Sequence, residues 1–114
     1  MRINSLKQVK KTVMDMPGAE GVEKQIPISK ADGTPNFSLR VFTIEPGGHT
    51  PHHTHPFEHL NYVIEGSGAV VSAEGERPVK KGDFVLVMPG EVHQYRNTST
   101  KPLIVICGVP KENE

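Results

Sequence analysis

Short runs of alternating or wholly apolar residues follow one another along most of the chain. Residues 37–45 carry apolar side chains on both alternations, with Leu39 and Val41 on one and Phe42 and Ile44 on the other. A strand with apolar side chains on both faces is typical of the wall of a barrel or sandwich. Seven further strands are predicted, at 22–29, 60–65, 69–73, 79–81, 84–88, 92–96 and 103–109.

Turn signals separate these runs. The chain contains 11 glycines and 10 prolines, which predicts many short strands joined by tight turns. Turns are predicted at 31–35, 46–48 and 89–90, and a hairpin connection at 74–78. Pro27 marks the first run as an edge strand, because proline cannot donate to a ladder. The pattern as a whole predicts an all-β fold, a sandwich or barrel of jelly-roll type.

The two ends of the chain have weaker patterns. In residues 1–20, the weak apolar spacing of Ile3, Leu6, Val9 and Val13 indicates either one short helix or an irregular arm. At 114 residues the chain is long enough for one domain and too short for two. We therefore expect an N-terminal arm over 1–20 and a single barrel domain over 21–114. The last four residues are polar and are expected to fray.

Charge and composition narrow the classes of partner. The 13 Lys and Arg residues balance 13 Asp and Glu residues, so no basic face is expected for nucleic acid or an anionic membrane. The longest apolar run, 103–107, is far shorter than the roughly 20 residues that span a bilayer. The N-terminus lacks the pattern of a signal peptide, and one cysteine excludes an internal disulfide. We expect a cytoplasmic protein with a small-molecule ligand.

The histidines are unevenly distributed. Five of the six lie within residues 49–59, and His93 stands apart. Because the neutral imidazole is a common protein ligand for transition metals, this crowding predicts a metal site. Side chains two apart on a strand share a face, so His53 and His55 can point into one cavity.

The same alternation directs His52 away from that cavity. Pro56 then allows a turn that returns His59 toward it, and His93 is the remaining candidate from another part of the chain. The hypothesis is a mononuclear site of four histidines, in which His49 and His52 are bystanders.

Two motifs resemble those of the cupin family. The first, G-x5-H-x-H-x3,4-E-x6-G, is similar to Gly47-x5-His53-x-His55-x3-His59-x6-Gly66. The second, G-x5-P-x-G-x2-H-x3-N, is similar to Gly82-x5-Met88-x-Gly90-x2-His93-x3-Asn97. The resemblance covers 47–97 and implies the cupin double-stranded β-helix, a jelly-roll barrel.

Two positions depart from the family pattern. Met88 replaces a proline, although Pro89 still supplies the turn, and His59 replaces the usual glutamate. The second change makes the chain similar to small single-domain cupins whose metal is held by four histidines. Glu58 is the less favoured ligand, because its spacing from His55 is one residue short and places it on the opposite face.

An all-imidazole site leaves a metal its full positive charge and is expected to keep two positions open for other ligands. We expect one divalent transition metal ion per chain. Imidazole suits Fe, Zn, Ni, Co or Cu, whereas the resemblance favours manganese.

Further candidates line the predicted pocket. Val105 and Cys107 share a face of the last strand, which in cupins passes the metal cavity, although Cys107 could equally be a small buried hydrophobe. Tyr95 shares the parity of His93 and could bind a ligand or simply pack. Arg40 could bind a substrate carboxylate, but pairing with an acid such as Glu58 or Glu91 is favoured.

The resemblance also implies a homodimer formed through outer sheet faces, with the N-terminal arm taking part and apolar area expected from Phe42, Ile44, Leu60, Tyr62 and Ile64. The leading hypothesis is a metal-dependent enzyme acting on a small molecule, either an oxygenase or a Lewis-acid lyase, isomerase or cyclase. The alternative is a non-catalytic module that binds a sugar or another small molecule. Metal storage is a third and weaker hypothesis, because only one ion would be held per chain.

Overall fold

The computed structural model describes all 114 residues and confirms the all-β prediction. Its strands are β1 (Thr12–Val13), β2 (Glu20–Ile28), β3 (Phe37–His49), β4 (His59–Glu65), β5 (Ser67–Ser72), β6 (Gly75–Lys80), β7 (Phe84–Val87), β8 (His93–Arg96) and β9 (Leu103–Pro110). Three single-turn 3-10 helices accompany them, at Leu6–Gln8, Lys30–Asp32 and Lys111–Asn113. None of these helices is long and apolar enough to cross a membrane.

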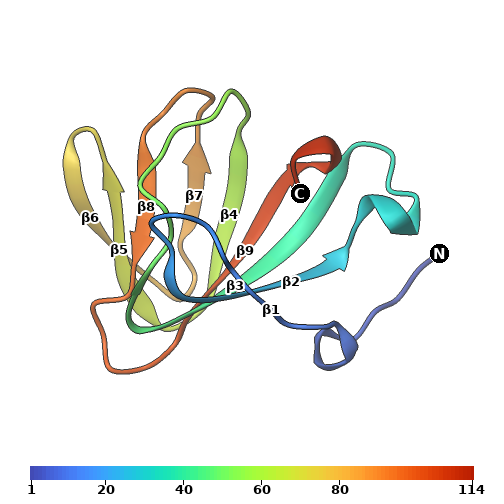
Figure 1. Cartoon of the computed structure of the whole chain (residues 1–114), viewed down its shortest axis with the longest axis horizontal. Helices are drawn as coiled ribbons and strands as arrows, with labels where there is room; N and C mark the ends of the chain where they lie inside the picture. Colours follow the sequence, from blue (N-terminus) through green and yellow to red (C-terminus); the bar gives the residue numbers. More distant parts are fainter.

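The strands form one curled antiparallel sheet in the order β6-β5-β8-β3-β9-β4-β7. The strand β2 also pairs with β3, and β1 pairs with β2. Figure 1 shows the sheet folding over so that β6 and β5 face β7 and β4, while β9, β3 and β2 extend toward both termini. This arrangement confirms the predicted jelly-roll barrel.

The long strand β3 joins the two halves of the barrel. It pairs with β9 from Phe37 to Ile44 and reaches β8 at His49. The prediction of a turn at 46–48 is wrong, because the strand bends there and continues. A side chain at Gly48 would come within 2.6 Å of the Glu20 carbonyl oxygen, so the bend needs a residue without a Cβ.

The hairpin of β5 and β6 is also longer than predicted. β6 begins at Gly75, so most of the connection predicted at 74–78 is strand. Pro78 is tolerated there because β6 lies at the edge of the sheet.

The core fills the barrel between the two halves of the sheet. Its buried members are Val22, Phe42, Ile44, Val63, Val79, Tyr95, Leu103, Val105 and Cys107. The expectation that Phe42 and Ile44 contribute to an outer face is wrong, because both point inward and are buried. Leu60 remains exposed on the outer face.

Both ends of the chain contact the sheet. The buried Gln25 amide donates hydrogen bonds of 2.9 Å to the carbonyl oxygens of Leu6 and Val9. At the other end, the carboxylate of Glu114 accepts hydrogen bonds from the Ser38 hydroxyl and from the Lys30 backbone, the latter at 3.0 Å. The expectation of a frayed C-terminus is therefore wrong.

Candidate metal centre

A pair of backbone hydrogen bonds places His53 beside His93. The His53 N–H donates to the His93 carbonyl at 3.2 Å, and the His93 N–H donates to the His53 carbonyl at 3.0 Å. His93 begins β8, whereas His53 lies in the loop between β3 and β4. This isolated bridge explains how residues far apart in sequence reach one point.

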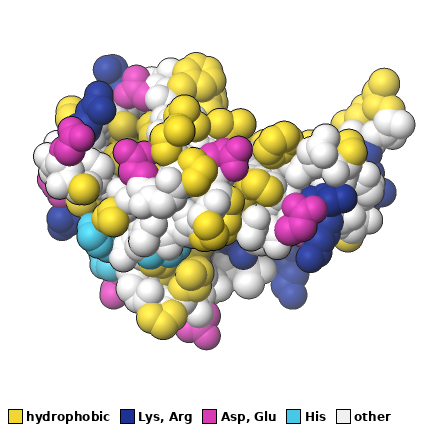
Figure 2. Space-filling model, turned by 90° about the horizontal axis from the view of Figure 1, so that it is seen from above, with side chains coloured by type: hydrophobic (Ala, Val, Ile, Leu, Met, Phe, Trp, Pro, Cys, Tyr) yellow, Lys and Arg dark blue, Asp and Glu magenta, His cyan; other side chains and the backbone are white.

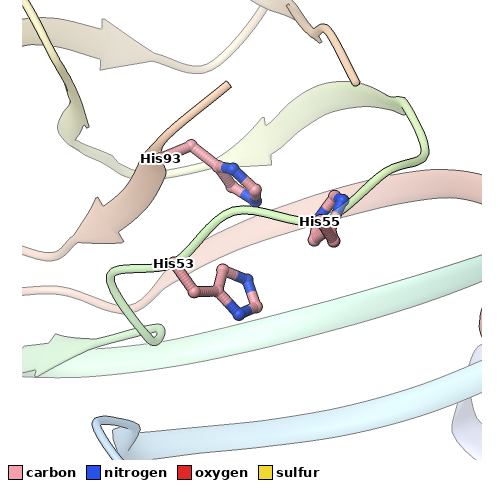
Figure 3. Close-up of side chains that lie close together, drawn as sticks. All are labelled: His53, His55 and His93. Atoms are coloured by element: carbon pink, nitrogen blue, oxygen red, sulfur yellow. The ribbon is translucent and has the colours of Figure 1, made fainter. Parts of the chain in front are cut away.

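The side chains of His53, His55 and His93 gather around this bridge. Each offers one ring nitrogen, and these three nitrogens lie within 4.8 Å of one another. Figure 3 shows the three rings approaching one another from two separate segments of the chain. A single ion can therefore be held by three imidazoles after small adjustments of the rings.

The backbone sets the tautomers of two of these histidines. Nδ1 of His55 lies 2.8 Å from the Phe57 carbonyl oxygen, and Nδ1 of His93 lies 2.9 Å from that of Glu91. A carbonyl only accepts, so both Nδ1 atoms carry the proton, which leaves a lone pair on each Nε2. Both Nε2 atoms are buried and have no hydrogen-bond partner. A metal ion would satisfy them, and the donor set fits one.

The surroundings of His53 and His55 favour the neutral form of these two imidazoles. Burial lowers the pKa of His53, and the neighbouring His93 lowers it further. Burial also lowers the pKa of His55, although the hydrogen bond to the Phe57 carbonyl opposes this change. Neutral imidazoles bind a metal without first releasing a proton.

His59, the fourth predicted ligand, borders the cluster but is not among its three close nitrogens. Its ring centre lies 4.4 Å from that of His55 and 5.2 Å from that of His93. Its Nε2 lies 3.1 Å from a guanidinium nitrogen, Nη2 of Arg40. A guanidinium only donates, so the lone pair of this Nε2 accepts a hydrogen bond. Burial, followed by the charge of Arg40, lowers the pKa of His59 to about 3.

Arg40 itself is buried, with only 8% of its surface exposed. Its Nη2 contacts Cys107 Sγ at 3.1 Å as well as His59, and the guanidinium lies 4.9 Å from the centre of the Phe42 ring. The favoured prediction of an ion pair with Glu58 or Glu91 is wrong, because no carboxylate lies within 4 Å of this guanidinium.

The other predicted pocket residues, Tyr95, Val105 and Cys107, lie in the buried core. The Tyr95 hydroxyl accepts a hydrogen bond of 2.7 Å from the Asn61 amide. Burial raises the pKa of Tyr95 and that of Cys107. The sequence analysis missed Asn61, whose Oδ1 is buried without a partner. Its position two residues after His59 on β4, on the same face, was the available signal.

The remaining candidates lie outside the cluster. His52 is exposed, and His49 on β3 has its Nδ1 near the Thr50 carbonyl at 3.3 Å and near the Gln94 amide at 3.4 Å. Glu58 does not belong to the group of close ligand atoms.

A cavity of about 510 Å³ opens beside the cluster, between β5, β6 and β7. Its walls are mostly apolar on β7, with charged residues at Glu74, Arg77, Asp83 and Glu91, and His93 forms part of the lining. Arg40, Tyr95, Val105 and Cys107 do not line it. The volume of the cavity falls within the range of small-molecule sites.

Figure 2 shows histidine side chains at the surface of the barrel end of the molecule, away from the projecting N-terminus.

The model of the family described as "Cupin domain" matches residues 40–109 of this chain. This segment is more than half of the chain and contains the three clustered histidines and His59.

Two relatives illustrate the range of matching sequences. Gentisate 1,2 dioxygenase 1 of Aquipseudomonas alcaligenes is 32% identical over 98 residues, which are 85% of this chain and 26% of that protein. An uncharacterized protein of Aquifex aeolicus is 29% identical over 96% of this chain and 90% of its own length. The chain thus spans about a quarter of the dioxygenase.

Among solved structures, the polyketide cyclase RemF from Streptomyces resistomycificus superposes with a TM-score of 0.92 at 28% identity, covering 97% of this chain and 80% of that one. A predicted oxalate decarboxylase from Thermotoga maritima superposes with a TM-score of 0.85 at 21% identity. The match covers 96% of this chain and 98% of that one. The second likeness concerns the fold alone.

Proposed function

This chain belongs to the cupin family, and from its histidine cluster we propose that it is a metal-dependent enzyme acting on a small molecule. The observation that carries the proposal is the pair of buried, unpartnered Nε2 atoms on His55 and His93 beside the ring of His53. Leaving two buried polar atoms unsatisfied is costly unless a ligand satisfies them.

The proposed cofactor is one divalent transition metal ion. His53, His55 and His93 would hold it, and His59 would become the fourth ligand if its Nε2 exchanged the Arg40 contact for the metal. Manganese is the ion favoured by resemblance to four-histidine cupins, and Fe, Zn, Ni, Co or Cu also suit imidazole. When bound, the metal supplies Lewis acidity that polarises an oxygen of the substrate.

The residues of the chain perform the other tasks of the site. The Phe57 and Glu91 carbonyls orient two of the imidazoles through Nδ1. The cavity bordered by His93 gives a small molecule room to approach the cluster.

Lewis-acid chemistry, such as that of a cyclase, lyase or isomerase, is the favoured reaction class. The ligands are neutral and no carboxylate joins them, so the charge of the metal is not reduced by the protein. The likeness to a polyketide cyclase extends over almost the whole chain. An oxygenase is the second candidate, supported by the 32% identity to the gentisate dioxygenase.

Metal content tests the proposal. Protein purified without an affinity metal, stripped with a chelator and then titrated with Mn, Fe, Co, Ni, Cu or Zn, should bind one ion per chain. His55→Ala and His93→Ala should weaken binding by about tenfold to a thousandfold, since each removes a ligand. His52→Ala is the matched control, because its ring lies outside the cluster. Equal losses in all three variants would refute the assignment of the site.

Oxygen uptake then separates the two reaction classes. A metal-loaded protein that consumes oxygen with an aromatic dihydroxy acid would be an oxygenase, whereas turnover of a cyclisable or isomerisable substrate without oxygen supports the Lewis-acid class. A non-catalytic binding module would bind small molecules without converting any of them. The apparent affinity for metal should also fall below neutral pH, since protonated imidazole cannot ligate.

A further inference from the structure

The buried guanidinium of Arg40 has no negatively charged partner. Four buried side-chain nitrogen or oxygen atoms make no hydrogen bond. They are Arg40 Nε, His55 Nε2, Asn61 Oδ1 and His93 Nε2. Two of these atoms belong to the proposed metal site. The other two, Arg40 Nε and Asn61 Oδ1, have no function assigned so far.

The strand register places these two residues in one row. Arg40 on β3 is opposite Cys107 on β9, and Cys107 is opposite Asn61 on β4. Residues directly opposite one another point to the same face of a sheet, and here that face is the interior of the barrel. His59 lies on this face as well, two residues before Asn61, and contacts Arg40.

The charges in this region are unbalanced. Arg40 carries one positive charge, and a divalent ion at the histidine cluster would add two. No carboxylate lies within 4 Å of the guanidinium. A buried cation is stable only when it is paired and hydrogen-bonded.

We propose that Arg40 is a substrate-recognition residue that binds a carboxylate of the ligand, and that Asn61 Oδ1 accepts a hydrogen bond from a neighbouring hydroxyl of the same ligand. The ligand class is therefore a small hydroxycarboxylate. The guanidinium offers planar N–H donors that match the two oxygens of a carboxylate. This inference rests on the proposed function only in placing the ligand next to a metal.

The test follows the Arg40 Nε–H signal by NMR during titration of the zinc-loaded protein and the metal-free protein. The probes are glycolate, which has both groups, acetate, which lacks the hydroxyl, and ethylene glycol, which lacks the carboxylate. Glycolate should shift the Nε–H signal at the lowest concentration, acetate should need more, and ethylene glycol should leave it unchanged. A signal that responds to none of the three, or equally to all three, would overturn the proposal.

Variants show whether Arg40 recognises the ligand or only supports the barrel. Arg40→Gln should weaken glycolate binding by about tenfold or more, the usual effect of losing a charge-assisted hydrogen bond. Arg40→Lys should retain part of the affinity, and Asn61→Asp should lose it through repulsion of the carboxylate. Arg96→Gln is the control, because Arg96 pairs with Glu76 on the surface. Unchanged affinity in Arg40→Gln together with a lower Tm would mean that Arg40 is structural, and would refute the proposal.

Zinc occupancy, measured separately, distinguishes this inference from the proposed function. If zinc binds and glycolate does not, only the inference fails. If zinc does not bind but glycolate still shifts the Arg40 signal of the metal-free protein, the metal-dependent function fails and the recognition role of Arg40 stands.

Discussion

At the scale of single residues, His59 has two competing partners, Arg40 and the candidate metal site. The motif spacing assigns it to the metal, yet in the structure its Nε2 is bound to Arg40. One lone pair cannot serve a metal and a guanidinium at the same time. Four-histidine ligation therefore requires Arg40 to move to another partner, which the proposed carboxylate would supply.

The burial of His59 makes the stability of the metal-free protein depend on pH. Its pKa falls to about 3 in the folded protein, mainly through burial and then through the charge of Arg40, whereas it is about 6.5 in an unfolded chain. Between these values the unfolded state binds a proton that the folded state does not. The free energy of unfolding is therefore highest above about pH 6.5 and decreases as the pH falls toward 3.

Urea unfolding of chelator-treated protein at several pH values measures this effect. His59→Gln, whose amide oxygen can still accept from Arg40, should flatten the pH dependence by up to about 1.4 kcal/mol per pH unit, the contribution of one proton. His52→Gln replaces an exposed ring and should leave the slope close to that of the original protein. A slope unchanged in His59→Gln would show that this imidazole is not the one that resists protonation.

At the scale of elements, the turn between β4 and β5 depends on the absence of a side chain at Gly66. Gly66 has a φ of +82°, and a Cβ there would lie 2.2 Å from the Pro102 carbonyl oxygen. Gly82, before β7, also has a positive φ, of +97°, but nothing lies within 4 Å of its added Cβ. The two glycines share the backbone requirement and differ in the space around them.

This difference gives a matched pair of variants. Gly82→Ala should lower the free energy of unfolding by about 1–2 kcal/mol, the cost of a left-handed conformation for a residue with a side chain. Gly66→Ala should cost about 1–3 kcal/mol more, because the backbone must move to relieve the overlap. Chemical denaturation of both variants at pH 7 provides the comparison. Equal losses of unfolding free energy in the two variants would mean that the backbone around Pro102 moves aside at little cost and would contradict the prediction.

The strands were predictable because each apolar run is short and ends in a turn signal. The errors lie where long-range packing decides the outcome. Gly47 and Gly48 were interpreted as a turn, but β8 and β2 pair with the chain around them, so β3 bends there and continues. Likewise, Phe42 and Ile44 were expected on an outer face, but the curl of the sheet turns both side chains into the core.

Only part of the candidate site could be predicted from the sequence. The motif spacing groups His53, His55 and His93 as ligands of one site, and the structure places their ring nitrogens close to one another. The contact between Arg40 and His59 was not predictable, because it joins strands whose relative register no local pattern specifies. Asn61, by contrast, could have been predicted from local spacing, because it lies two residues after His59 on the same face of β4.

At the scale of the whole molecule, an apolar patch remains on the outer face of β4 and β7. Its members are Leu60, Tyr62, Phe84 and Leu86, which are paired across the two strands. Phe84 is 81% exposed and Leu86 57% exposed. A contiguous exposed patch on a sheet is unfavourable in water unless a partner covers it. Together with the homodimer implied by resemblance, this favours a second copy of the chain as the partner.

Light scattering coupled to gel filtration measures the association directly. The original protein should elute with a mass about twice the 12.5 kDa of one chain. Leu86→Lys should shift the equilibrium toward the monomer, because association would then bury an unpaired charge in the centre of an apolar patch. Phe37→Lys is the control, since Phe37 is 49% exposed at the start of β3, outside the patch and outside the N-terminal arm. A monomeric original protein, or a dimer that survives Leu86→Lys, would exclude this face as the interface.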